Sequence, residues 1–328
     1  MTIGRVTTSQ IWSSSNDSIQ TAKARLSQLS AQSSSGLAVT KPSDDPAAAA
    51  AIMSVLGQQS TNAQYATNIS DGQGWLSTAD STMTSAENLV RQAKDLAIQA
   101  GNSGTASAAS RAAIATQLQG IQNDLLTAAN TQYNGRSIFA GTSDSATAFD
   151  PTTFAYNGAT TSTTTTAPDG TTTTTLSSAG SVQRRIGPGA SGLVTVSADG
   201  LAAFGSGSTS VFAQIQNVIA ALNSPTYATD TSSTGPQATV TAGIDALGTA
   251  LTNLSAQHAV VGANYARMTS ASTQNATTAT ALETQRSGLQ DADTTKTLLD
   301  LKTQELAYQT ALQVTAQVIQ PTLMSFLS

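Results

Sequence analysis

Apolar residues recur at steps of three and four along both ends of the chain, the spacing of a coiled-coil helix. Between Thr8 and Ser33 this repeat consists of Trp12, Ile19, Ala22, Leu26 and Leu29. Near the C-terminus it consists of Leu301, Tyr308, Leu312, Ala316, Ile319, Leu323 and Phe326, with Leu306, Val314 and Val318 broadening the apolar stripe. We expect two long helices that pack against each other and against neighbouring copies of the chain. With the exception of the two alanines at 22 and 316, the residues of both repeats are candidate assembly residues.

The inner helices carry more regular repeats. One set of apolar residues lies seven apart at Ile69, Leu76, Met83, Val90 and Ala97, and a companion set lies at Gly72, Ala79, Ala86, Ala93 and Ala100. The small companion residues indicate close approach of a neighbouring backbone. A third helix, with Ile114 and Leu118 in its repeat, is expected to stop near Asn134-Gly135. A further repeat runs from Val240 to Met268 and predicts one very long helix, or two nearly collinear helices.

The middle of the chain has a different pattern. From Ser137 to about Gly207, apolar residues alternate with polar ones or cluster near prolines, which predicts short strands and hairpins. Two threonine runs flank Pro168-Asp169-Gly170, and both a polar β-hairpin and a solvated, modified surface loop remain open for them. The segment from Val211 to Leu222 predicts a short helix.

These patterns predict a mainly α fold with a β-rich insert. The two termini form a long antiparallel coiled coil or helical bundle, and a small outer β-rich domain is added to it. We expect residues 1–45 and 290–328 to form a terminal coiled-coil assembly layer. Residues 46–136 and 236–289 are expected to form a helical bundle, and residues 137–235 the outer domain with a short helix.

Charge and composition exclude several classes of function. The net charge of −5, without clustered Lys or Arg, argues against nucleic acid or an anionic membrane as a partner. The chain has no cysteine and one histidine, His258, so thiolate metal sites and a cysteine nucleophile are ruled out. His258 lies on the repeat of a long helix, which favours a structural role over catalysis. We therefore expect no enzyme activity, cofactor or metal site.

Two acidic residues stand together in the turn Lys41-Pro42-Ser43-Asp44-Asp45-Pro46. A carboxylate pair can bind a cation or act in acid–base chemistry. Here Asp45 directly precedes Pro46, a residue suited to the first position of a helix, so helix capping is the preferred interpretation. A second helix is expected to start at this point.

The two ends of the chain also bear on membranes and export. Residues 306–328 carry no charge, but Gln309, Gln313, Gln317, Gln320 and Pro321 interrupt them, which favours a packed helix over a membrane span. The segment Met1 to Trp12 lacks the uninterrupted apolar run of a secretory signal. If the protein is exported, we expect another route.

Several motifs resemble those of the bacterial flagellin superfamily. The opening repeat, Ser34-Ser35-Gly36 and the turn Pro42, Ser43, Asp44, Asp45, Pro46 followed by Ala47-Ala48 resemble its N-terminal signature. Further likeness lies in Ala129–Gly141, which contains Asn134, Gly135 and Arg136, in Val261-Gly262-Ala263-Asn264 and in the tail from Leu299 to Leu327. The proline after the acidic pair favours the branch of the superfamily that joins the flagellar hook to the filament over flagellin itself.

The resemblance implies an extracellular subunit of the bacterial flagellum that self-assembles into a tubular junction layer. It implies export without a cleaved signal peptide. It also implies as partners copies of itself, the other hook–filament junction protein, flagellin, and a cytosolic export chaperone at the C-terminal helices. A short flagellin that forms the filament itself is the alternative. A secreted enzyme with its active site in the central insert is a more remote alternative.

Overall fold

The computed structural model describes residues 8–102, 107–166 and 172–319, which form two compact units. Unit 1 contains the ends of the chain, up to residue 63 and from residue 277 onward, and unit 2 contains residues 64–276. The helices are α1 (Thr8–Ser35), α2 (Pro46–Asn102), α3 (Ala108–Ala129), α4 (Gly200–Phe204), α5 (Val211–Leu222), α6 (Pro236–Gln290) and α7 (Thr294–Ile319). The predicted mainly α architecture with a strand-containing insert is confirmed.

The strands lie in the insert and at its entry. They are β1 (Gln132–Tyr133), β2 (Arg136–Ser137), β3 (Thr160–Thr166), β4 (Thr172–Ser178), β5 (Gln183–Arg185) and β6 (Leu193–Thr195), with short 3₁₀ turns at Ala190–Gly192 and Gly207–Thr209. They form three antiparallel pairs, β1 with β2, β3 with β4 and β5 with β6.

The repeats of α2 and α6 form the helical core of unit 2. All ten α2 residues of the two predicted seven-residue repeats are buried. Their partners on α6 include Val240, Leu247, Leu254, Val261 and Met268, which are also buried and also lie seven apart. The Met268 side chain of α6 fills the space beside Gly72, where an added Cβ would clash with its terminal methyl group. The small residue at 72 thus leaves room for a large side chain of the neighbouring helix.

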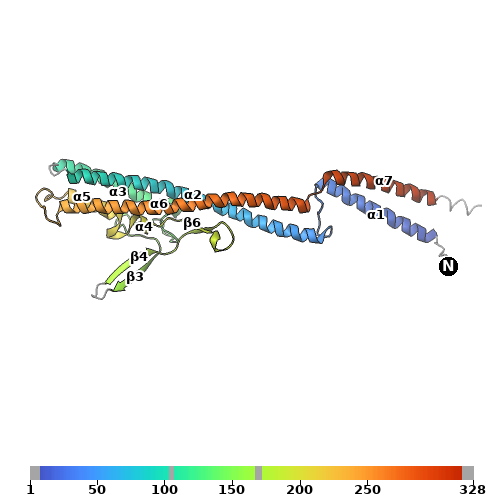
Figure 1. Ribbon diagram of the computed structural model, residues 1–328, viewed down its shortest axis with the longest axis horizontal. Coiled ribbons are helices and arrows are strands. Elements are labelled where there is room, and N and C mark those ends of the chain that lie inside the picture. The colour runs from blue at the N-terminus through green and yellow to red at the C-terminus, as the bar shows by residue number, and fades with distance from the viewer. Residues whose placement is uncertain (1–7, 103–106, 167–171, 320–328) are drawn as a thin grey trace, which may run out of the picture. The chain divides into compact units, whose positions relative to one another are not determined.

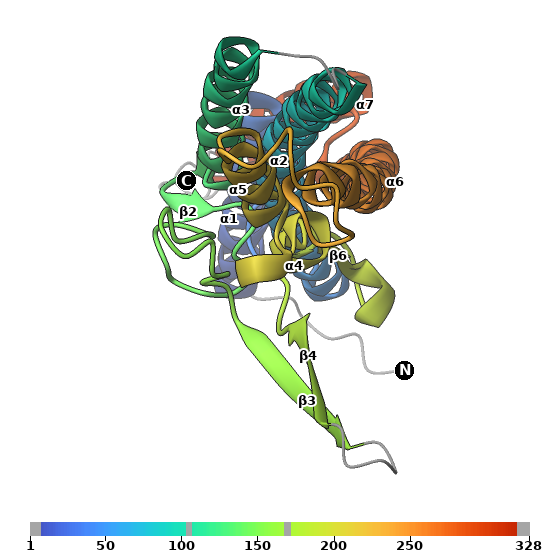
Figure 2. The same ribbon diagram turned by 90° about the vertical axis from the view of Figure 1, so that its left-hand side faces the viewer.

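Aromatic residues form the core of the insert. Five of the six phenylalanines of the chain gather there, at 139, 149, 154, 204 and 212, with successive ring centroids 5.2–5.7 Å apart. The helix α5 brings Phe212 to this cluster and packs on α3 through its apolar face. Figure 2 shows α2, α3, α5 and α6 gathered together, with the β3–β4 hairpin extending away from them.

The expected end of the third helix was wrong. The helix α3 ends at Ala129, and Asn134-Gly135 forms the turn between β1 and β2. Asn134 and Gly135 have φ angles of 50° and 78°, the left-handed pair that a two-residue hairpin turn requires. The Asn-Gly pair was therefore a hairpin signal rather than a helix stop.

The threonine runs form a hairpin. Thr160 pairs with Ser178 and Thr166 with Thr172, which gives seven facing pairs. All seven residues of β3 are exposed, so no core supports this strand. The residues 167–171 between the strands lie outside the described part. Among the described residues, no helix combines the length and apolarity that a bilayer-crossing segment needs.

Candidate assembly interface

The two terminal helices α1 and α7 run side by side in opposite directions within unit 1 (Figure 1). Ser15 Oγ and Thr315 Oγ1 lie 2.6 Å apart near one end of the pair. Farther along, Gln304 Nε2 donates to the carbonyl oxygen of Ala22 at 3.3 Å. The sum of the paired residue numbers changes little between these contacts, as an antiparallel register requires.

The contact between α1 and α7 follows one heptad seam on each helix. On α1 the seam residues are Ser15, Ile19, Ala22, Leu26, Leu29 and Ser33, and on α7 they are Thr297, Leu301, Gln304, Tyr308, Ala311 and Thr315. Seven of these twelve residues are polar or alanine, so little apolar area is removed from water. Leu29 is the one leucine or isoleucine of the described seam that is fully buried. Because burial contributes only about 25 cal/mol per Å² of apolar surface, the pair gains little stability by itself.

A second seam lies on the opposite face of α7, where it faces solvent. It consists of Leu299, Thr303, Leu306, Thr310 and Val314, at steps of four, three, four and four. The hydroxyls of Thr303 and Thr310 donate to the carbonyl oxygens of Leu299 and Leu306, at 2.9 and 2.8 Å. Each threonine thereby satisfies its hydroxyl within the helix. We call these five residues the outer seam.

Exposed apolar side chains are concentrated in unit 1. Of the twelve large apolar side chains that are exposed in the described part, eight belong to this unit, namely Trp12, Met53, Leu56, Leu298, Leu299, Leu306, Leu312 and Val314. The same unit contributes only four of the buried apolar residues. Exposed apolar surface of this kind marks sites of protein–protein contact. The outward face of α1, in contrast, is polar at Ser14, Asp17, Ser18, Thr21 and Arg25.

The sequence-predicted assembly residues fall into three groups. Leu29 is buried, and Ile19, Leu26, Leu301 and Tyr308 are half-buried between α1 and α7. Trp12 and Leu312 remain exposed. The side chain of Ile319, and Leu323 and Phe326 entirely, lie outside the described residues.

Sequence reasoning treated the apolar residues of α7 as one wide stripe. The structure divides them between two seams on opposite faces, because α1 covers only one face of the helix. Leu299, Thr303 and Thr310 of the outer seam were not singled out. The seven-residue spacing of Leu299 and Leu306 was the available signal.

The acidic pair of the loop between α1 and α2 has a structural role. Asp44 Oδ2 accepts hydrogen bonds from the hydroxyl and amide of Thr40 and from the amide of Lys41, at 2.9–3.1 Å. These bonds, with the Thr40 hydroxyl first, hold the pKa of Asp44 below its ordinary value. Asp45 Oδ1 accepts from the amides of Ala47 and Ala48, at 3.0 and 2.9 Å, and so caps α2. Pro42, Ser43 and Pro46 complete this exposed turn.

The loops that follow α1 and α6 are hydrogen-bonded to each other. The amide of Ala38 donates to the carbonyl oxygen of Gln290 at 2.7 Å, and the amide of Ala292 donates to Gly36 at 2.8 Å. Gly36 has a φ of 70° and its amide bonds back to Gln32, the left-handed ending that glycine favours at a helix C-terminus. The two terminal helices are therefore tied together where they enter the rest of unit 1.

His258 joins α6 to α2 within unit 2. Its Nδ1 lies 2.9 Å from Glu87 Oε1, and its Nε2 lies 2.9 Å from Asp80 Oδ1. Glu87 is also paired with Arg91 at 2.7 Å. Partial burial by itself would lower the pKa of His258, but the hydrogen bonds to Glu87 and Asp80 outweigh it and raise the pKa above its ordinary value. The histidine thus bridges α6 and α2 through two carboxylates of α2.

Acidic residues of the insert are used in turns. Asp150 Oδ1 accepts from the amides of Thr152 and Thr153 at 2.9 and 2.7 Å. The exposed Asp144 lies 3.7 Å from Arg136, the residue that follows the Asn-Gly turn. Within the described ranges, no group of three His, Asp or Glu side chains is arranged to hold a metal ion.

Comparison with known proteins identifies both ends of the chain. The profile of the bacterial flagellin N-terminal helical region matches residues 6–144, and that of the flagellin C-terminal helical region matches residues 244–327. These are two regions of one family, and they span 139 and 84 of the 328 residues, well over half of the chain.

Individual relatives carry related names. Flagellar hook-associated protein 3 of Salmonella typhimurium is 36% identical over 155 residues, which are 47% of this chain and 49% of the relative. A flagellin of Bacillus subtilis is 29% identical over 117 residues, 33% of this chain and 36% of the relative. The chain thus matches about half the length of the first relative and about a third of the second.

A solved structure shares the fold. The structure of a putative flagellar hook-associated protein from Vibrio parahaemolyticus aligns with a TM-score of 0.60 at 18% identity. The alignment covers 76% of this chain and all of the other. At this identity the likeness concerns the arrangement of the elements alone.

Proposed function

Because the chain belongs to the bacterial flagellin superfamily, we propose that it is a structural subunit of the flagellum that joins the hook to the filament. The observation that carries the proposal is the outer seam of α7. Its residues follow steps of three and four along one face, its threonine hydroxyls are satisfied within the helix, and it has no partner in the described residues. Such a surface fits a helix from a neighbouring subunit.

The role in assembly follows from the energetics of the terminal pair. The α1–α7 seam buries little, so much of the stability of these helices would come from contacts made in the assembled structure. We assign residues 1–45 and 290–328 to the assembly layer, the helical bundle to residues 46–136 and 236–289, and an outward-facing domain to residues 137–235. The subunits transmit force through packing and need no catalytic residue.

The proposed neighbours are copies of this chain, the other hook–filament junction protein and flagellin. A cytosolic chaperone that covers the outer seam before export fits the same surface, because an exposed apolar stripe favours premature association. Passage to the outside would use the flagellar export route without a cleaved signal peptide. The relation to hook-associated protein 3 favours the junction over the filament, since that relative is both more similar and more fully covered than the flagellin.

Deletion of the gene in its source bacterium tests the proposal. Electron microscopy of the deletion strain is expected to show hooks without filaments, and flagellin is expected to accumulate unpolymerised in the medium. The full chain supplied from a plasmid should restore filaments. Filaments that form normally in the deletion strain would contradict the junction role.

The flagellin alternative makes a different prediction for the purified protein. A flagellin polymerises alone into long filaments, whereas a junction subunit does not extend beyond short assemblies. Negative-stain microscopy of the concentrated chain separates the two. Long filaments of the chain alone would assign it to the filament itself.

A further inference from the structure

The outer edge of strand β4 carries unpaired backbone groups. The amide of Ala179 donates to the carbonyl oxygen of Ala159 at 2.6 Å, which continues the register in which Thr160 pairs with Ser178. In an antiparallel pair, hydrogen-bonded residues alternate with residues whose N–H and C=O point away from the partner strand. Counted back from Ala179, the residues that point outward are Ser178, Leu176 and Thr174.

A groove of about 510 Å³ runs along this edge. One wall consists of the five consecutive residues from Thr174 to Ser178, and the other includes Leu201 and Ala202 of α4. Successive side chains of a strand point to opposite faces, so a groove on one face would be lined by every second residue. A groove lined by consecutive residues therefore follows the edge of the strand. No strand of the described part pairs with β4 on this side.

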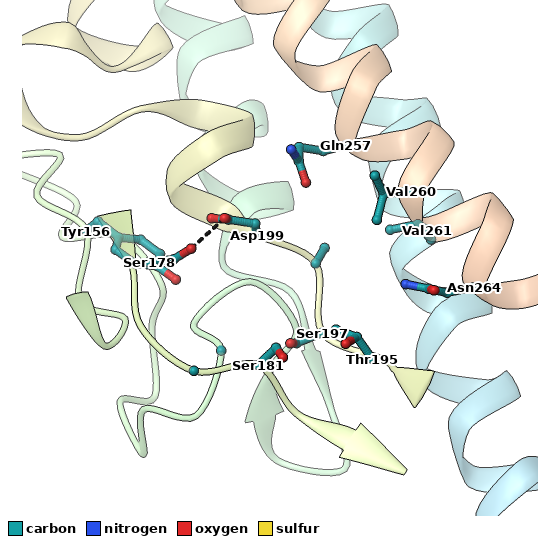
Figure 3. A pocket seen from close by; sticks show the side chains of 13 residues that line it. Tyr156, Ser178, Ser181, Thr195, Ser197, Asp199, Gln257, Val260, Val261 and Asn264 are labelled. Atoms are coloured by element: carbon teal, nitrogen blue, oxygen red, sulfur yellow. Dashed lines mark hydrogen bonds between the residues drawn. The ribbon is translucent and has the colours of Figure 1, made fainter. Parts of the chain in front are cut away.

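A second cavity of about 270 Å³, drawn in Figure 3, adjoins the groove. Ser178 and Asp199 line both spaces. In the figure, Gln257, Val260 and Asn264 of α6 form the far wall of this cavity, opposite Asp199. The end of the β4 edge therefore leads to a carboxylate.

Asp199 is a carboxylate without a cationic partner. Its Oδ1 accepts the amide of Ala202 at 3.0 Å and so caps α4, and its Oδ2 accepts the Ser178 hydroxyl at 2.5 Å. It forms no ion pair with any residue that the structure describes. The groove beside it also exposes half of the Leu176 side chain. The site therefore combines a strand edge, an apolar contact and one negative charge.

We propose that this groove binds an extended segment of another protein chain, which adds as a third strand to β4 and places a lysine or arginine beside Asp199. Backbone hydrogen bonds to Thr174, Leu176 and Ser178 would hold the segment, as in other cases of strand addition. An apolar side chain would cover Leu176. The charge of Asp199 selects a basic residue, since none of the cationic residues that the structure describes forms an ion pair with it.

The hairpin itself is consistent with such an occupant. Isolated two-stranded hairpins are marginally stable in water. A third strand adds backbone hydrogen bonds and shields the side chains of the neighbouring strand from water. Proteins protect exposed edges from unwanted pairing with charges or proline. The strand β4 has neither, because its residues are threonines, a leucine and serines.

Fluorescence anisotropy with the full chain tests the proposal. The probe is a labelled peptide of sequence Lys-Thr-Val-Thr-Val-Thr-Lys, which offers a basic residue at either orientation. The matched controls are the same peptide with glutamate at both ends and the same peptide with N-methylated valines. Saturable binding of the lysine peptide alone is expected, and equal binding of all three peptides, or no saturable binding, would overturn the proposal.

Variants of the chain locate the contact. Asp199→Asn keeps a side chain that can cap α4 but removes the charge, and it should weaken binding of the lysine peptide about tenfold. Thr174→Pro removes one outward N–H without breaking a bond to β3 and should abolish binding, whereas Thr174→Val should bind as the unchanged chain does. If Thr174→Pro does not fold, the N-methylated peptide tests the same bonds. Unchanged affinity in Asp199→Asn would refute the charge contact.

Discussion

The outer seam of α7 gives the sharpest prediction about assembly. In the double substitution Leu299→Gln with Leu306→Gln, both side chains keep a length and helix propensity close to those of leucine but lose their apolar character. The two leucines are 67% and 66% exposed in the free chain. Full burial of a leucine contributes about 1.5–3 kcal/mol, so covering the exposed two thirds contributes about 1–2 kcal/mol for each residue. Together they amount to roughly 2–4 kcal/mol, a loss of roughly 30-fold to 1000-fold in the subunit association constant.

The folded chain itself should barely change. Both leucines already face water, so the free energy of unfolding is expected to stay within about 0.5 kcal/mol of the unchanged chain. Urea denaturation followed by circular dichroism measures that quantity. Sedimentation velocity over a range of concentrations measures self-association, and the recovery of filaments in a deletion strain reports on assembly in the cell.

A neighbouring leucine supplies the matched control. Leu298→Gln makes the same chemical change at an exposed position about 100° away around the helix axis, off the outer seam. It should leave association nearly unchanged. The reasoning is refuted if the double variant assembles like the unchanged chain, or if Leu298→Gln alone impairs assembly as strongly as Leu299→Gln alone.

Three further predictions concern the folded chain. Asp45→Ala removes the cap of α2 and should lower the free energy of unfolding by about 0.5–2 kcal/mol, measured by urea denaturation. Leu76→Ala opens a cavity in the core of unit 2 and should lower the same quantity by about 2–5 kcal/mol. The pKa of His258 is raised in the folded state, so its stabilising contribution is complete below the unfolded value of 6.5 and is lost as the pH rises through the folded pKa. Urea denaturation at a series of pH values should therefore show the stability advantage over His258→Gln falling as the pH increases.

Each of the three has its own control. Asp45→Asn retains a capping oxygen and should behave like the unchanged chain. An equal loss in both variants would argue against the cap. A Leu76→Ala variant no less stable than the unchanged chain would contradict the packing of α2. A difference between His258→Gln and the unchanged chain that stays constant with pH would show that protonation of His258 contributes nothing to stability.

Local sequence was sufficient to predict a helix and its buried residues wherever the apolar repeat followed the face that the fold buries. All ten residues of the two seven-residue repeats of α2 are buried, because a helix with two packed neighbours buries the same two rows along its length. Other buried residues of α2, such as Trp75, lie outside these repeats. The start of α2 at Pro46, with Asp45 as its cap, followed from adjacent residues alone. The helix α5 was also predictable, since its apolar residues keep one period.

The end of α3 depended on a contact that the repeat does not contain. Asn130 accepts the amide of Phe149 at 2.8 Å and donates to its carbonyl oxygen at 3.1 Å, which turns the chain away from the helix. The hairpin at Asn134-Gly135 follows directly. The helical repeat gave no sign of this bond across nineteen residues.

The sequence by itself determined that this chain has long terminal helices and an interrupted middle. Only the tertiary structure decided which face of α7 meets α1 and which face, at Leu299 and Leu306, remains open. The reason is that a helix with apolar residues on two sides has two possible seams, and its own sequence does not say which one a partner covers. That choice was made by α1 and by the bond between the amide of Ala38 and the carbonyl oxygen of Gln290, and it leaves the outer seam exposed.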